Sequence, residues 1–582
     1  MLHYIYSRSL VGIVFFMAMA LVIWSILSVR IAEKHWRTGN LIFASLMAFS
    51  ILYATLLSRA EGSTGVILAP FASFTAARQQ PEIYRSMLMN VFLFFPFGLS
   101  FANALPRKWH HCIRILLTTL TACLFSIGIE YTQYRFSLGL TETDDVICNT
   151  LGAFLGSASL LLAHAIEIRN ERRLHRNMVL TTIETQFLQI TKAAVSGGEL
   201  PAENVDWQAI FTIAGQQKLM PILFEAVRKS PAADENAILF DTIKKQVIGQ
   251  VLNQTVRSVE FTELYGKLRA AGLHPLVVKG ILCSRLYPLK DHRISADDDM
   301  CIPDAEFMMC HEQLLANGLH ANDLTTETAP DALMTADEVS YTKKDSPLYI
   351  ELHRHLFDSS EDAHDELNHF FADVQPMEID GFLTMPPHVH LLYLILHAYK
   401  HFVSCGIGLR QFCDIGFWAR EYYDRIHWQE LYEQCASVHA AVFATAAFRI
   451  AREYLGIPLA LPSPWSGTVD VEPLLHDTLC GGVYGSNDYT RLHSSTITLN
   501  AVKSSRKGEK SSILRTVFPK KAYLETRYPY LKKHPYLLPA AWIQRIAHYA
   551  EEKQGSADNS ASGSIRLAKE RVALMKQYGI MD

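Results

Sequence analysis

Three consecutive aspartates are the residues best placed to do chemistry in this chain of 582 residues. They lie in RISADDDMCIP, residues 293–303, where apolar residues typical of a buried strand follow them. Successive side chains of a strand point to opposite faces, so Asp297 and Asp299 share one face and Asp298 points away. Two neighbouring carboxylates repel each other unless a cation lies between them. Their hard oxygen atoms suit Mg²⁺ or Mn²⁺, the ions that bind phosphate oxygens in nucleotidyl transfer.

A third carboxylate and a phosphate-binding turn are predicted on either side of this stretch. LYIELHRHL alternates apolar and polar residues, which is typical of a strand, and places Glu351 on the polar face. In PLVVKGILCSRLY an apolar strand ends at Lys279 and Gly280, and a helix begins. A glycine there lets backbone N–H groups approach a phosphate, and the lysine adds positive charge. We therefore predict a nucleotidyltransferase site in which Mg²⁺ or Mn²⁺ is bound by Asp297, Asp299 and Glu351.

The order of these motifs resembles that of a bacterial family of uncharacterised nucleotidyltransferases, a branch of the polymerase-beta-like superfamily often associated with surface-polysaccharide genes. The resemblance extends roughly from Trp207 to the C-terminus and rests on VVKGILCSRLYPLKDHRISADDDMCI, YIELHRHLF, LILHAYKHF and GLRQFCDIGFWAR. It implies an α+β nucleotidyltransferase fold with helical extensions. It also implies that metal binds Asp297, Asp299 and Glu351 and that Gly280 lies by the phosphates of a nucleoside triphosphate (NTP). We expect Lys279, Arg293 and Arg410 to contact the same nucleotide.

Structural roles remain open for several of these residues. The carboxylates could form a solvated acidic turn beside an unrelated strand glutamate, and Lys279 could simply end a strand. Arg410 and Asp414, at i and i+4 of a predicted helix, could form a salt bridge or position a nucleotide. His397 and His401 have a spacing that can bind zinc, but the chain lacks the glutamate of an HExxH motif there. We therefore favour packing or substrate contact for these histidines.

Five apolar segments in the first third of the chain predict an all-α membrane domain. They are residues 10–29, 41–57, 87–105, 113–131 and 146–164. Basic residues cluster after the first, third and fifth segments, which places those loops in the cytoplasm and the N-terminus outside. This topology predicts an inner-membrane protein whose C-terminal part is cytoplasmic, where nucleotides are available.

Polar side chains within these segments exceed what an anchor needs. Ser126, Glu130 and Gln133 form one stripe of the fourth segment, while Asp145 and Asn149 occur where the fifth begins. A glutamate in lipid needs polar partners, and we expect Gln133 or Asn149 to supply them. We interpret Glu130, Gln133, Asp145 and Asn149 as a polar site, functional rather than only structural.

The membrane segments also resemble a known family. NVFLFFPFG, SIGIEYTQ and DDVICNTLGAFLG are similar in order and spacing to the VanZ-like family, over roughly residues 4–162. Gly152 and Gly156 have the small-xxx-small spacing of closely packed helices. The family is named for glycopeptide-antibiotic resistance, so the resemblance implies an envelope function.

Length and composition set further bounds. A chain this long predicts several domains, and we expect boundaries at 1–166, 167–204 (a juxtamembrane helix and linker), 205–465 and 466–582 (a helical extension). A net charge of −4 argues against a specific nucleic-acid partner, which would favour a basic face. Ten cysteines without a C-x-x-C pair predict reduced core residues rather than disulfides or zinc ligands. Residues 504–512 and 554–564 are of low complexity and predict exposed loops.

Together these features predict a membrane-anchored enzyme that transfers NMP from an NTP to an unknown acceptor, in cell-envelope or surface-polysaccharide metabolism. The alternative is a non-catalytic membrane scaffold or nucleotide sensor with a VanZ-like envelope role. Pyrophosphate release would distinguish the two.

Overall fold

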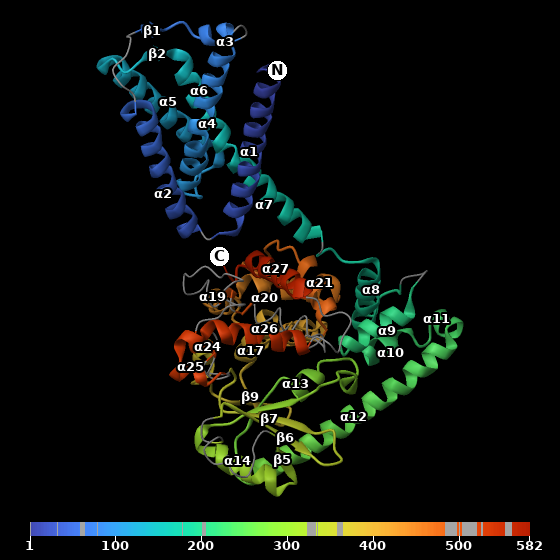
Figure 1. Ribbon diagram of the computed structural model, residues 1–582. Coiled ribbons are helices and arrows are strands. Elements are labelled where there is room, and N and C mark those ends of the chain that lie inside the picture. Colours follow the sequence, from blue (N-terminus) through green and yellow to red (C-terminus); the bar gives the residue numbers. More distant parts are fainter. Residues whose placement is uncertain are drawn as a thin grey trace. The chain divides into compact units, whose positions relative to one another are not determined.

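The computed structural model divides the chain into two compact units, Met1–Arg176 and Asn177–Asp582. Their elements are labelled in Figure 1. The structure describes residues 2–31, 33–58, 65–77, 80–176, 178–200, 205–322, 333, 336–357, 365–404, 406–482, 498–499, 501–502, 521–524, 528–552 and 561–581. The predicted loop 504–512 and most of the loop 554–564 lie outside these residues; 561–564 belong to a helix.

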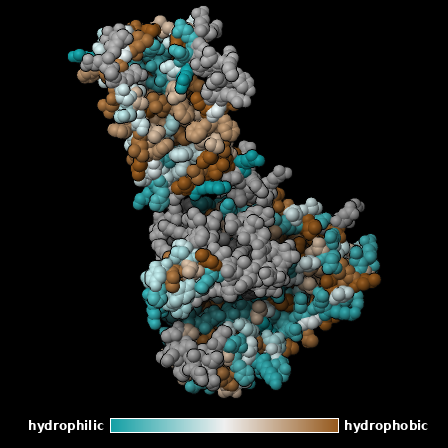
Figure 2. Space-filling view, in the orientation of Figure 1, coloured by the Kyte–Doolittle hydropathy of each residue, from teal (hydrophilic) through white to brown (hydrophobic). Residues whose placement is uncertain are grey.

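The first unit is a bundle of long apolar helices. They are α1 (Leu2–Arg30), α2 (Glu33–Leu52), α4 (Pro81–Ala104), α5 (His111–Phe136), α6 (Thr143–Ser157) and α7 (Ser159–Arg176). The described residues provide five stretches long and apolar enough to span a membrane, in agreement with the five predicted segments. Their outward side chains are apolar, such as Phe49 and Leu124 at 63% and 70% exposed. Figure 2 shows hydrophobic residues over the face of this unit, as expected for a surface in lipid.

The loops of this unit alternate between its two ends, as predicted. At one end the Arg107 side chain donates to the backbone oxygens of Ser28 and Ile31, so the loops after α1 and α4 meet there. At the other end β1 (Gly65–Ile67) pairs in parallel with β2 (Leu140–Glu142), beside the short helix α3 (Ala72–Ala76) (Figure 1).

Helices α4 and α6 pack against each other through glycine. A Cβ atom built on Gly152 would lie 2.1 Å from the carbonyl oxygen of Val91, and one on Gly156 would lie 2.2 Å from that of Phe95. Only hydrogen fits at such distances. The close approach that the glycine spacing predicts is therefore present.

The second unit is built on a five-stranded mixed sheet of order β3-β4-β7-β6-β5. The strands are β3 (Leu276–Val278), β4 (Asp298–Cys301), β5 (Leu319–Ala321), β6 (Glu338–Lys343) and β7 (Tyr349–His353). Strand β4 runs parallel to β7 and antiparallel to β3. The two predicted acidic strands are thus direct neighbours in the centre of the sheet.

Helices surround this sheet. The helices before it include α9 (Trp207–Gln216), α10 (Met220–Val227), α11 (Pro231–Glu235) and α12 (Ala237–Ala270). After β4 and β7 come α14 (Asp304–Ala316), the hairpin β8 (Met377–Ile379) and β9 (Phe382–Thr384), α17 (Pro387–Ser404), α18 (Leu409–Glu421), α19 (Trp428–Ser437), α20 (Ala441–Arg449), α21 (Glu472–Gly481), α26 (Leu538–Glu552) and α27 (Ala561–Gln577). The long α12 lies along the sheet (Figure 1), and its Arg257 bonds to Asp298 of β4 and to the backbone of Tyr349 in β7.

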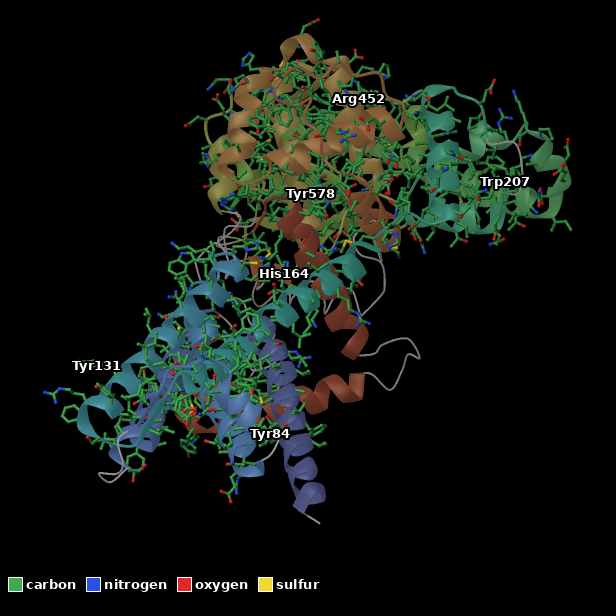
Figure 3. The ribbon with its side chains drawn as sticks, turned by 90° about the horizontal axis from the view of Figure 1, so that it is seen from above. Tyr84, Tyr131, His164, Trp207, Arg452 and Tyr578 are labelled. Carbon is green, nitrogen blue, oxygen red and sulfur yellow. The ribbon has the colours of Figure 1, made fainter. Side chains whose placement is uncertain are left out.

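The core of this unit extends beyond the predicted nucleotidyltransferase segment. Helix α8 (Thr182–Ser196), in the segment expected to be a linker, contributes Phe187 to the same apolar cluster as Trp207 and Trp465. Tyr578, which directly follows α27 and is labelled in Figure 3, is fully buried in that cluster. The expected linker and C-terminal extension therefore pack into one body with the sheet.

Candidate active site

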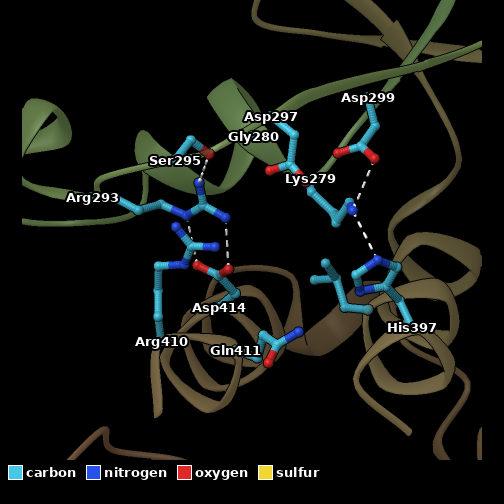
Figure 4. Close-up of a pocket in the computed structure, with 11 residues that line it drawn as sticks. Lys279, Gly280, Arg293, Ser295, Asp297, Asp299, His397, Arg410, Gln411 and Asp414 are labelled. Atoms are coloured by element: carbon cyan, nitrogen blue, oxygen red, sulfur yellow. Dashed lines mark hydrogen bonds and ion pairs between the residues drawn. The ribbon is translucent and has the colours of Figure 1, made fainter. Parts of the chain in front are cut away.

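The three aspartates of β4 alternate as a strand requires. Asp298 points behind the sheet, where its carboxylate accepts from Arg257 Nε of α12 at 2.5 Å. Arg257 also donates to the carbonyl oxygens of Tyr349 and Ser295, which ties β4, β7 and the loop before β4 to one helix. Asp297 and Asp299 instead line a pocket on the other side (Figure 4).

The register of β4 and β7 brings the second acidic residue to this pocket edge. Asp299 is the Cα partner of Glu351, so their side chains leave the same face of the sheet. His353, two residues later on β7, approaches Asp299 Oδ1 with its Nε2 at 3.2 Å. One ligand atom from each of Asp299, Glu351 and His353 lies within 4.8 Å of the others. This is the spacing expected of side chains that share one metal ion.

Lys279 enters the pocket from a constrained turn. It follows β3 with a φ of 54°, and Gly280 has a φ of 36° at the start of the short helix α13 (Gly280–Ser284). The Lys279 backbone N–H donates to buried His390 at 3.2 Å, which supports this sparsely populated conformation. The Lys279 ammonium lies 2.9 Å from Asp299 Oδ1 and 2.9 Å from His397 Nε2 (Figure 4).

The opposite wall of the pocket comes from α18 and the loop before β4. The Arg293 guanidinium donates to both carboxylate oxygens of Asp414, at 2.8 and 2.7 Å, and to Ser295 Oγ at 3.0 Å. Asp414 therefore forms its ion pair with Arg293, from the loop before β4. This pair replaces the salt bridge with Arg410 that the i, i+4 spacing suggested. Arg410 lines the pocket too and donates to the carbonyl oxygen of Ile294.

Burial and the charges in the pocket shift the pKa values of Asp299 and Glu351 in opposite directions. Burial would raise the pKa of Asp299, but the Lys279 ammonium and His353 outweigh it and hold that pKa well below its usual range. Burial raises the pKa of Glu351 to about 9, and the nearby carboxylates of Asp299 and Asp297 add to the effect. Three acidic side chains, those of Asp297, Asp299 and Glu351, thus gather around the single ammonium of Lys279, a condition that favours binding of a further cation.

All seven residues predicted for the metal and the nucleotide are close to this pocket. Six of them line it, namely Asp297, Asp299, Lys279, Gly280, Arg293 and Arg410. Glu351 contacts the same group through the register with Asp299. Sequence reasoning missed His353, although it lies on the polar face of the strand predicted around Glu351. It also missed Arg257, whose partner Asp298 is 41 residues away.

The polar side chains of the first unit are buried but differ from the predicted pairing. The Glu130 carboxylate accepts from the backbone N–H of Glu142 at 3.1 Å, and Gln133 donates to the carbonyl oxygen of Thr55. Asn149 donates to Ser126 Oγ at 2.9 Å. The expected partnership of Glu130 with Gln133 or Asn149 is thus replaced by bonds to the backbone and to the serine. Near this end, Asp145 accepts from Asn90 at 2.6 Å and Asp144 accepts from the backbone N–H groups of Phe71 and Ser73.

Comparisons with known proteins match both parts of the chain. Residues 203–456 match the model of a family described as uncharacterised nucleotidyltransferase, and residues 13–164 match the VanZ/LLP1 family. Protein VanZ of Enterococcus faecium is 32% identical over 100 residues, which are 17% of this chain and 58% of VanZ. The chain thus spans just over half the length of that relative. No solved structure matches the chain. Both resemblances found in the sequence are confirmed, and the chain joins a VanZ-like domain of five candidate membrane helices to a nucleotidyltransferase-family domain.

Proposed function

We propose that the protein is a membrane-anchored, metal-dependent nucleotidyltransferase that moves NMP from an NTP to an acceptor and releases pyrophosphate. The observation that carries the proposal is the register of β4 and β7, which pairs Asp299 with Glu351 beside Asp297 and Lys279. The match to a nucleotidyltransferase family over the same residues supports the reaction class.

The residues present fit a divalent cation such as Mg²⁺ or Mn²⁺. Asp299 is 2% exposed, and its Oδ2 atom has no hydrogen-bond partner among the described residues. A buried carboxylate oxygen without a donor is costly unless a cation binds it. Asp297, Asp299 and Glu351 would bind the ion, with His353 beside them. When bound, the ion supplies Lewis-acid charge stabilisation to the reacting phosphate.

Other residues of the pocket would position the nucleotide. The Lys279 ammonium would become a charge partner for phosphate oxygens when a cation binds its present partner Asp299, and Gly280 lines the pocket beside it. Arg293 is held rigid by Asp414 and Ser295, so it shapes the wall and adds positive charge. Arg410 extends this cationic wall from α18.

We propose further that the nucleotidyltransferase-family domain is cytoplasmic, at the inner membrane, with the N-terminus outside. More of the basic residues of the first unit lie at the end with the loops after α1 and α4 than at the end with Arg85 and Arg135, which is the distribution of a cytoplasmic face. The polar site of Glu130, Gln133, Asp145 and Asn149 would then lie toward the outer side. An acceptor of the cell envelope or of surface polysaccharide metabolism follows from joining such a domain to a VanZ-like one.

The test uses the full chain in detergent or nanodiscs, NTPs labelled at the α-phosphate, and a cell extract as the source of acceptor. We expect Mg²⁺-dependent labelling of an acceptor together with pyrophosphate release. Asp299→Asn should reduce the rate by about 10²–10⁴-fold, since metal charge stabilisation is worth several kcal/mol. Asp304→Asn is the matched control, because Asp304 is 69% exposed and lies outside the pocket.

Two results would contradict the proposal. Full activity in Asp299→Asn would show that the aspartate does not act in the reaction. Metal-dependent nucleotide binding without pyrophosphate release, over all four NTPs and several extracts, would favour the nucleotide sensor instead.

A further inference from the structure

Glu184, His476 and Cys480 form a second cluster of metal-ligating side chains, on elements that do not contribute to the candidate active site. Glu184 lies in the first turn of α8, and the other two lie at i and i+4 of α21, so they share one face of that helix. The carboxylate and the imidazole are 292 residues apart in sequence. One ligand atom of each residue lies within 4.8 Å of the others.

The distances within this cluster are those of a tetrahedral zinc site. His476 Nδ1 lies 3.1 Å from Glu184 Oε1, and Cys480 Sγ lies 3.6 Å from the same oxygen and 3.9 Å from Nδ1. Zinc bond lengths of about 2.0–2.3 Å at tetrahedral angles place oxygen and nitrogen about 3.3 Å apart, sulfur and oxygen about 3.5 Å, and sulfur and nitrogen about 3.6 Å. Each edge therefore agrees to within a few tenths of an ångström.

The surroundings of Glu184 prepare it to act as a ligand. Its Oε2 accepts from the backbone N–H of Thr181 at 2.7 Å, in a capping box that begins α8. This bond fixes the carboxylate, whose two oxygens each lie 3.1 Å from His476 Nδ1 and whose Oε1 lies 3.6 Å from Cys480 Sγ. The Glu184 side chain is 8% exposed, whereas Cys480 is exposed, so the cluster is buried at the carboxylate and open to solvent at the thiol.

A nucleophilic cysteine with His476 as its base is the competing arrangement. It requires the sulfur to face one ring nitrogen, yet Cys480 Sγ lies 3.6 Å from Nε2 and 3.9 Å from Nδ1. It also requires the carboxylate to contact the imidazole alone, whereas Glu184 Oε1 lies as close to the sulfur as Nε2 does. Three ligand atoms that converge on one another favour a shared ion over a relay.

We propose that Glu184, His476 and Cys480 bind one Zn²⁺ ion, with the fourth position taken by water or an external ligand. Sulfur, imidazole and carboxylate together suit zinc better than Mg²⁺ or Mn²⁺, which prefer oxygen ligands only. The ion links α8 to α21 within the second unit and stabilises a contact between distant parts of the chain.

Cobalt provides a direct test, because Co²⁺ adopts the zinc geometry and absorbs light. The full chain, reduced and with any affinity tag removed, is titrated with Co²⁺ in detergent. We expect a thiolate-to-cobalt charge-transfer band with intense visible bands of a tetrahedral ion, both bleached by one equivalent of Zn²⁺. Cys480→Ser should abolish the charge-transfer band and lower zinc affinity by more than tenfold, since even loss of a supporting residue costs about 10–100-fold.

Cys112→Ser is the matched control, since Cys112 is the other exposed cysteine among the described residues and also has histidine neighbours, His110 and His111. That variant should keep the band. His476→Asn should lose the tetrahedral visible bands, and thermal unfolding of each variant verifies that it is folded. A band that persists in Cys480→Ser, or that Cys112→Ser removes, would overturn the proposal, as would the absence of any band in the native chain.

Discussion

The neighbouring residues Asp298 and Asp299 should differ in their effect on transfer activity when each is replaced by asparagine, because only Asp299 lines the pocket. Asp298→Asn leaves Arg257, whose side chain is 6% exposed, without its charged partner. Removal of one member of a buried ion pair costs about 3–5 kcal/mol. For a unit of roughly 400 residues, with an unfolding entropy of about 2.1 cal/mol/K per residue, this loss lowers the melting temperature by about 4–6 °C. Asp299→Asn also breaks a buried ion pair, since the Lys279 ammonium lies 2.9 Å from Asp299 Oδ1, so we expect it to lose stability as well and, unlike Asp298→Asn, to lose transfer activity.

The assay is thermal unfolding of the full chain in detergent micelles at pH 7.5, followed by intrinsic fluorescence, next to the transfer assay. At this pH Asp298 is ionised in the native chain, although burial raises its pKa to about 6. Arg257→Met combined with Asp298→Leu should recover most of the lost stability, because neither charge is then buried alone. If Asp298→Asn melts like the native chain, or if folded Asp298→Asn loses transfer activity while Asp299→Asn keeps it, the assignment of faces on β4 is wrong.

Two further predictions concern packing and pH. Gly152→Ala places a methyl group against the backbone of α4 and should destabilise the first unit by about 1–3 kcal/mol in thermal unfolding. Gly128→Ala is the control and should leave the stability unchanged, because a Cβ atom there would have no neighbour within 4 Å. Equal stability of the two variants would contradict the close packing of α4 and α6. Burial lowers the pKa of His390 to about 3 from 6.5, so the unfolded chain binds a proton more readily, and stability falls as pH drops below 6.5. Between pH 7.5 and 5 the loss amounts to about 2 kcal/mol, which His390→Gln should remove from the pH profile of unfolding; an unchanged profile would refute it.

Local patterns in the sequence predicted the parts of the site that depend on local geometry. The period of two separates Asp297 and Asp299 from Asp298, and the glycine after Lys279 marks the turn that follows β3. The alternation of the aspartates and the turn after β3 follow from backbone geometry over a few residues, and the structure contains these two features.

Pairings across the fold could not be predicted from spacing. Asp414 has an arginine at i−4, but it pairs with Arg293 because the loop before β4 brings a planar guanidinium against both of its oxygens. The bond from the backbone of Glu142 to Glu130 follows from the close return of the chain after α5. The contact of Glu184 with His476 depends on the packing of α8 into the second unit, in a segment whose composition predicts a linker.

The charge balance of the pocket explains why one lysine contacts both an acid and a histidine. Asp297, Asp299 and Glu351 together exceed the positive charge of Lys279. Desolvation and the nearby Lys279 hold the pKa of half-buried His397 well below its usual range, so it accepts from the ammonium as a neutral base. Lys279 therefore partly neutralises Asp299 while remaining anchored on an uncharged partner. A cation that binds the carboxylates competes for Asp299, and the ammonium is then available for an anion in the same pocket. The Lys279 ammonium, with Arg293 and Arg410 on the facing wall, is best suited to bind the oxygens of a phosphate group.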